Sequence, residues 1–117
     1  MFVLRSILLV VLLAGCAAAN RPLQLLSTAE LQYPEQALNE GVQGSVVVVY
    51  DVEMTGRVAN LRVLESEPEG VFNQAALDYV RSWRFNPPMV DGEPVAAPGR
   101  QSTITFRLGN SDEYDRY

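Results

Sequence analysis

The chain has 117 residues and a formal net charge of −5, because 14 acidic side chains outnumber 9 basic ones. It contains no histidine, the commonest general base and metal ligand, and its acidic excess leaves no basic patch for a nucleic acid. Carboxylates such as Asp51, Glu53 and Glu65 therefore have no histidine to act with. We expect no catalytic residues, no metal or other cofactor, and no nucleic-acid partner; the protein is predicted not to be an enzyme.

The first 15 residues have the pattern of a secretory signal peptide. Arg5 supplies a positive charge, Ile7 to Leu13 form a short apolar run, and Ala14-Gly15 follow as small residues at a cleavage site. The apolar run is far shorter than the ~20 residues that span a bilayer as a helix. Removing residues 1–15, whose one charge is Arg5, changes the net charge from −5 to −6.

Cys16 is the only cysteine, so it has no partner for a disulfide within one chain. The sequence Leu13-Ala14-Gly15-Cys16 resembles the bacterial lipobox, in which the cysteine becomes the mature N-terminus. The resemblance implies that Cys16 carries acyl chains such as palmitate, and two or more chains anchor a protein stably to a membrane. The alternative is ordinary secretory cleavage that leaves a free thiol.

Residues 16–32 lack clear periodicity and are predicted to form a lipidated N-terminus and tether, with a reach of roughly 55 Å if fully extended. The stretch around Leu23–Leu26 is the part expected to pack on the domain. Residues 33–109 then form one domain. A short helix is predicted over 34–40, with Pro34 at its start and Gly41 after its end. The β-branched run 45–52 and the stretch 57–64 predict a hairpin.

The second half of the domain begins with the acidic stretch 65–70, which is predicted to be a solvated loop because it lacks the alternating ligands of a calcium site. A helix is expected over 71–83, where apolar residues recur every third or fourth position. Residues 89–100 contain prolines and Asp91-Gly92, which indicate a loop with at most a short extended segment. Residues 101–108 alternate as a third strand, with Ile104, Phe106 and Leu108 inward. Residues 110–117 form a polar tail.

The predicted order of helix, strand, strand, helix, strand indicates an α+β fold. We expect a two-layer sandwich in which two short helices pack on a three-stranded antiparallel sheet. A sheet of three strands has two edges, and an uncovered edge presents unpaired backbone groups to another chain.

The same residues, taken in order, resemble the C-terminal domain of the TonB family over residues 33–108. The matching pieces are Tyr33-Pro34 with Ala37 and Gly41, Gly44 before Val46–Val52, Gly56-Arg57-Val58, Ser66-Pro68-Gly70 before Phe72, Ala75-Ala76-Leu77, and Val80–Phe85 with Pro87. TonB proteins connect an inner-membrane motor to outer-membrane transporters. The resemblance implies that this domain adds a short extended segment of a transporter, the TonB box, to its sheet as a strand.

Carried over by position, the resemblance assigns two partner-binding segments. The receiving edge strand would be Gln101, Ser102, Thr103, Ile104, Thr105, Phe106, Arg107 and Leu108. A second segment would be Glu30, Leu31, Gln32 and Tyr33. Tyr33, Trp83 and Phe85 also fit a role in the core, which is the interpretation we favour for Trp83 and Phe85.

The sequence shows neither the inner-membrane helix nor the long proline-rich spacer of a TonB energy transducer. We therefore expect a protein anchored in the cell envelope by its lipid, facing the periplasm, and Ala17 after Cys16 favours the outer membrane. The expected partner is an outer-membrane TonB-dependent transporter or another envelope protein. The alternative is a structural lipoprotein that self-associates as a homodimer through the same edge and has no part in energy transduction.

Overall fold

The computed structural model describes residues 20–109. Its elements, in chain order, are β1 (Gln24–Ser27), α1 (Glu35–Glu40), β2 (Gly44–Val52), β3 (Val58–Glu67), α2 (Asn73–Arg81), β4 (Arg84–Asn86), β5 (Met89–Val90), β6 (Glu93–Pro94) and β7 (Ala97–Phe106). No helix in this range is long and apolar enough to cross a membrane.

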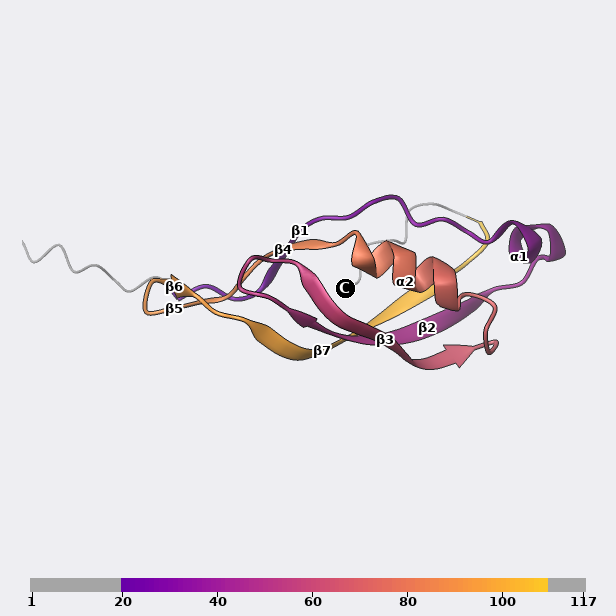
Figure 1. Ribbon diagram of the computed structural model, residues 1–117. Coiled ribbons are helices and arrows are strands. Elements are labelled where there is room, and N and C mark those ends of the chain that lie inside the picture. The colour runs from indigo at the N-terminus through magenta and orange to yellow at the C-terminus, as the bar shows by residue number, and fades with distance from the viewer. Residues whose placement is uncertain (1–19, 110–117) are drawn as a thin grey trace, which may run out of the picture.

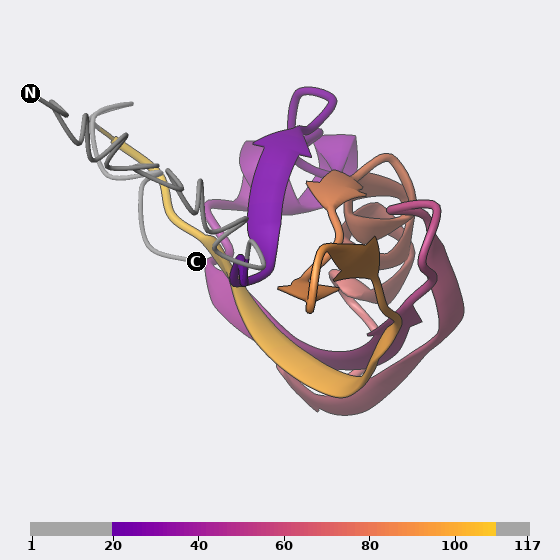
Figure 2. The same ribbon diagram turned by 90° about the vertical axis from the view of Figure 1, so that its left-hand side faces the viewer.

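The main sheet has three antiparallel strands in the order β3-β2-β7. Strand β2 is the central strand, and its residues alternate strictly, with Val46, Val48, Tyr50 and Val52 all buried on one face. Helix α2 and the short strand β4 lie on that face, and the sheet curves around them (Figures 1 and 2). Helix α1 sits at one end of the sheet, where Ala37 joins the core.

Helix α2 buries the apolar stripe that its sequence predicts. The buried members of the stripe are Phe72, Ala76, Tyr79, Val80 and Trp83. At one end of the core Phe72 stacks on Phe106 of β7 with ring centroids 4.4 Å apart. At the other end the Trp83 ring meets Tyr50 of β2 edge-on at 5.9 Å. Phe85 is also buried, so the predicted core roles of Trp83 and Phe85 are confirmed.

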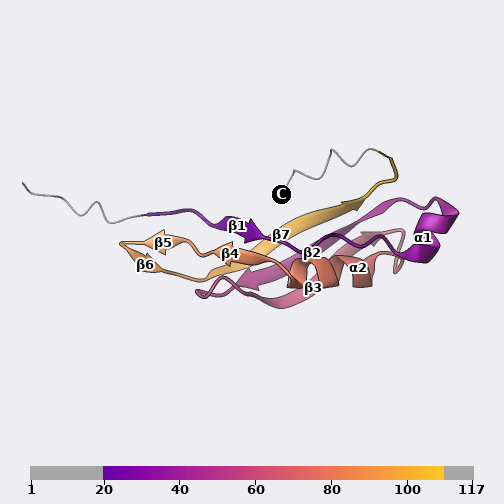
Figure 3. The same cartoon turned by 90° about the horizontal axis from the view of Figure 1, so that it is seen from above.

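Strands β1 and β4 form a separate antiparallel ribbon that lies over the main sheet beside α2 (Figure 3). The ribbon is docked through Gly56, in the turn between β2 and β3, whose carbonyl accepts a hydrogen bond from Phe85 N–H at 2.8 Å. Gly56 has φ 86°, and a Cβ there would lie 1.9 Å from the Phe85 carbonyl oxygen. Only glycine allows this approach of two backbones.

The α+β class, the two helices and the three-stranded antiparallel sheet are thus confirmed. Several predicted boundaries were wrong. The stretch Glu65–Glu67, predicted as loop, continues β3, because an edge strand can direct carboxylates into solvent. The predicted loop 89–100 contains the small hairpin of β5 and β6 and the first residues of β7. The stretch around Leu23–Leu26 does pack on the domain as expected, with Leu23 and Leu25 against the core, but the strand β1 that it forms with β4 was not predicted.

Candidate partner-binding edge

Strand β7 pairs with β2 along one side only. From Gly44↔Phe106 to Tyr50↔Arg100 the two strands keep one register without a shift. Within residues 20–109 no strand pairs with the other side of β7, so this side is an edge of the sheet. A regular edge of this kind is a ready template for an added strand.

The backbone groups of β7 alternate between β2 and the outer side, as in any strand. The Leu108 N–H donates to the Gln43 side-chain oxygen at 2.8 Å, on the β2 side. Alternation back along the chain then directs the N–H and C=O groups of Gln101, Thr103 and Thr105 away from β2. These residues carry the hydrogen-bonding groups that a new strand would meet.

The side chains of β7 divide between the two faces of the sheet. Ile104 and Phe106 are buried beneath α2 and its neighbours, and Ser102 is held by a 2.9 Å hydrogen bond between its hydroxyl and that of Tyr50. Gln101, Thr103 and Thr105 are exposed on the opposite, open face. No charged side chain occurs between Gln101 and Phe106, so nothing along this run repels a neighbouring strand by charge.

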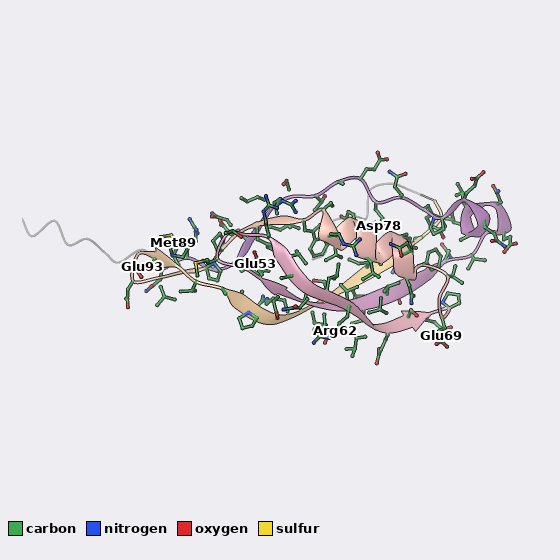
Figure 4. All side chains as sticks on the ribbon, viewed as in Figure 1. Glu53, Arg62, Glu69, Asp78, Met89 and Glu93 are labelled. Carbon is green, nitrogen blue, oxygen red and sulfur yellow. The ribbon has the colours of Figure 1, made fainter. Side chains whose placement is uncertain are left out.

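The opposite edge of the sheet, formed by β3, is irregular and charged. Its register with β2 shifts twice, and Asn60 within it has φ 52°. Arg62, Glu65 and Glu67 are exposed along it, and Figure 4 shows Arg62 on the side of the sheet away from α2. Bulges and charges are the features that keep an edge strand from pairing with other chains. The two edges therefore differ, and β7 is the one suited to docking.

The second predicted segment, Glu30–Tyr33, runs extended between β1 and α1. Leu31 and Tyr33 are half-buried against the core, whereas Glu30 and Gln32 are exposed. The Tyr33 ring meets Phe72 edge-on at 5.5 Å and Phe106 of β7 at 5.8 Å, and its hydroxyl donates to the Val42 carbonyl.

The structure thus brings the two predicted segments together at one point, the contact between Tyr33 and Phe106. Arg107 and Leu108 lie just beyond the end of β7, although they were predicted to continue the strand. The predicted lipidation site, Cys16, lies outside the described residues.

Sequence reasoning missed one feature of the edge, an irregularity at its start. Between Tyr50↔Arg100 and Val52↔Ala97 the register moves by one residue, next to Gly99 with φ 66°. The Gly99 N–H donates to a carboxylate oxygen of Asp51 in β2 at 2.8 Å. The dipeptide Pro98-Gly99 was the available signal, but it is equally typical of a loop.

Residues 20–109 contain no group of acidic side chains or cysteine that could hold a metal ion. A shallow hollow on the open face of the sheet is lined by Ser45, Val47, Glu65, Ser66 and Glu67. It lies between β2 and β3, away from the outer edge of β7. The arrangement at β7 therefore provides a linear backbone surface rather than an enclosed site.

A model of the Gram-negative bacterial TonB protein C-terminal family matches residues 29–108. The chain is a member of the TonB C-terminal family. Protein TonB of Yersinia enterocolitica is 40% identical over 101 residues, which are 86% of this chain and 36% of that protein. Protein TonB of Escherichia coli K12 is 32% identical over 88 residues, covering 75% of this chain and 34% of the relative.

A solved TonB domain has the same fold. The solution NMR structure of the Pseudomonas aeruginosa TonB CTD superimposes with a TM-score of 0.60 and 28% identity, covering 75% of this chain and 88% of that one. The chain therefore matches nearly the whole of a TonB C-terminal domain, but it spans only about a third of the length of the full TonB proteins it resembles.

Proposed function

We propose that this TonB-family domain binds an extended segment of another envelope protein by adding it as a strand to the outer edge of β7. In such β-augmentation the backbone hydrogen bonds supply the attraction and alternate side-chain contacts supply the selectivity. The observation that carries the proposal is the unshifted run from Arg100 to Phe106, which has no strand on its outer side within residues 20–109.

The partner class follows from the family. TonB proteins act on outer-membrane transporters, and the expected ligand is a TonB box of such a transporter or a similar extended segment. The exposed side chains of Glu30 and Gln32 stand on the chain segment that contacts β7 through Tyr33, so they could add contacts at one end of the edge. The proposed role is a docking module linked to TonB-dependent transport.

We further propose that Cys16 is acylated and holds the domain at the outer membrane, facing the periplasm. The first described residues already contact the domain: Asn20 accepts a hydrogen bond from Asp91 N–H at 3.1 Å, and Arg21 pairs with Met89. Four residue steps from Cys16 to Asn20 reach at most about 14 Å. The tether would therefore be much shorter than the sequence predicts, with the β5–β6 end of the domain nearest the membrane (Figure 4 labels Met89 and Glu93 there).

The docking proposal is tested by NMR titration of the isotope-labelled protein with synthetic TonB-box peptides from transporters of the same cell. We expect amide shifts concentrated at Gln101–Leu108 and Glu30–Tyr33. Absence of shifts at millimolar peptide, or shifts confined to the β3 edge, would refute docking on β7.

The same edge would also serve self-association, in which β7 of one copy pairs with β7 of another. This alternative makes the protein a structural envelope lipoprotein with no part in energy transduction. Sedimentation at several concentrations separates the two, because a monomer at micromolar concentration excludes self-assembly as the main role.

The lipid proposal needs a separate test. Intact mass spectrometry of the protein made in Gram-negative cells should show loss of residues 1–15 together with the added mass of acyl chains, and Cys16→Ser should abolish the added mass. An unmodified thiol at Cys16 would show that the cleavage is an ordinary secretory one.

A further inference from the structure

Asp51 joins the central strand to both of its neighbours through one carboxylate. Its Oδ2 accepts a hydrogen bond from the Asn60 side-chain amide in β3 at 2.7 Å. Its Oδ1 accepts one from the backbone N–H of Gly99 in β7 at 2.8 Å. Arg62 donates to the Asn60 carbonyl at 3.0 Å and steadies the β3 side. Asp51 is thus bonded to both edge strands at the same level of the sheet.

Both of its partners lie where a strand departs from regular geometry. Asn60 has φ 52° and Gly99 has φ 66°, and each lies where the pairing with β2 shifts register. A left-handed glycine followed by one extra residue is the G1 form of β-bulge. Asp51 therefore contacts the one bulge that interrupts the pairing of β7 with β2.

The bulge is required by what β7 buries on either side of it. Ala97 and Ile104 are both buried, at 8% and 5% exposure, yet they are an odd number of residues apart in the sequence. In an unbroken strand residues an odd number apart face opposite sides of the sheet. One inserted residue restores them to the same face. The position of the bulge therefore sets where the regular alternation of the docking edge begins.

We propose that Asp51 is a positioning residue for the docking edge. Asp51 holds the bulge at Gly99. The bulge in turn makes Gln101 the first residue of β7 whose backbone N–H and C=O groups point away from β2. Asp51 does not touch the bound segment. It determines which residues of β7 offer their backbone groups to that segment, and so the register in which the segment pairs. This inference rests on the proposed function for its binding consequence, although the clamp itself concerns the free protein.

The charge on Asp51 supports the same role. Hydrogen bonds from Asn60 and Gly99, followed by the positive charge of Arg62, lower the pKa of Asp51 below its ordinary value, while partial burial opposes them. The side chain is therefore a carboxylate at neutral pH, with both oxygens free to accept.

The test uses Asp51→Asn in the full-length protein in detergent micelles. The amide has the shape of the carboxylate but is neutral and has only one accepting oxygen. Asn60 can turn its own side-chain oxygen toward the new NH₂, but the Gly99 N–H then exchanges a charge-assisted hydrogen bond for a weaker neutral one. Asn60→Ala removes only the β3 half of the clamp. Asp78→Asn is the matched control, because Asp78 lies exposed on α2 and pairs with Arg81.

In the free protein we expect the Gly99 amide of Asp51→Asn to lose protection from hydrogen exchange, and the amide signals of Gly99 to Gln101 to shift. Residues near Phe106 should keep wild-type protection, which a general loss of stability would not allow. Asp78→Asn should leave all of these amides unchanged. Wild-type protection at Gly99 in Asp51→Asn would overturn the clamp.

With the TonB-box peptides, Asp51→Asn should weaken binding about 3- to 10-fold. The peptide response of Gln101 should be lost while that of Thr105 remains. An unchanged Kd and an unchanged pattern of shifts would overturn the positioning role even if the exchange result holds. If the wild-type protein binds no peptide, the docking proposal fails, and the exchange of Gly99 still decides whether Asp51 holds the bulge.

Discussion

Replacing Thr105 by proline tests whether the outer edge of β7 binds through its backbone. Thr105 lies in the uncharged run from Gln101 to Phe106, next to its end, and the alternation of β7 directs its N–H away from β2. Proline removes that N–H and places its ring in the path of an added strand. Since proline is tolerated on the outward side of edge strands, the domain should still fold.

The magnitude follows from the one hydrogen bond lost. A backbone hydrogen bond contributes about 0.5–1.5 kcal/mol net, which corresponds to a roughly 2- to 12-fold rise in Kd. The proline ring adds a steric cost, so this range is a lower bound. Thr105→Val keeps the N–H and a similar side-chain shape, and it should change Kd by less than about twofold.

Isothermal titration with the peptide that shifts the wild-type amides measures the three Kd values. Circular dichroism and a urea melt establish that each variant is folded. Folded Thr105→Pro protein with wild-type affinity would refute docking through the β7 backbone. A loss of affinity in Thr105→Val equal to that in the proline variant would show that the side chain, not the backbone, makes the contact.

Three further predictions concern the scaffold that holds the edge. Phe106→Ala should lower the free energy of unfolding in urea by about 3–5 kcal/mol, because Phe106 is fully buried and stacked on Phe72 at 4.4 Å; a loss below 1 kcal/mol would contradict this. Gly56→Ala should cost about 2–4 kcal/mol through strain at φ 86° and displacement of Phe85, with the largest amide shifts in β4; wild-type stability would show that the approach relaxes freely. The stability advantage of wild type over Asp51→Asn should be fully present above the ordinary carboxyl pKa of 3.8 and disappear as pH falls through the lower folded-state pKa; a difference unchanged at pH 2 would exclude the carboxylate as its source.

The sequence predicted the elements whose pattern is set by the core. The stripe of α2 and the alternation of β2 each follow from burial on one face, which periodicity reports directly. Strand β1 was missed because its partner β4 has only three residues, too few for a pattern, and because Leu25 is placed by Phe85 rather than by its own neighbours. Pairing between short segments far apart in the chain leaves little local signal.

The strand β7 that forms the proposed docking edge was predicted only in part. Alternation identified Ile104 and Phe106 as inward, but it cannot reveal a bulge, since the shift at Gly99 is defined only against β2. The start of β7 at Ala97 was not predicted, because the bulge interrupts the alternation between Ala97 and Gln101. The acidic end of β3 was predicted as a loop because charged residues indicate exposure to solvent. Both a loop and an edge strand are exposed, so charge alone does not distinguish them.

The two edges of the sheet differ in a way that restricts how a partner can approach. Strand β3 carries two register shifts and three charged side chains, whereas β7 is regular from Arg100 to Phe106. If a partner adds a strand as proposed, it would therefore extend the sheet at β7 only. The contacts of Asn20 and Arg21 with Asp91 and Met89 tie the start of the described chain to the β5–β6 end, opposite α1 (Figure 1).

If Cys16 is acylated, its short link makes that end the one nearest the bilayer. The edge of β7 then leads away from the membrane from Arg100 toward Phe106, because β6 lies just before β7 in the chain. A peptide can pair with this edge in either direction when it is free. A partner segment that is tethered in the same membrane can keep its own anchor close to the bilayer in only one strand direction. The partner's anchor would therefore select between parallel and antiparallel pairing with β7, which a free peptide does not do.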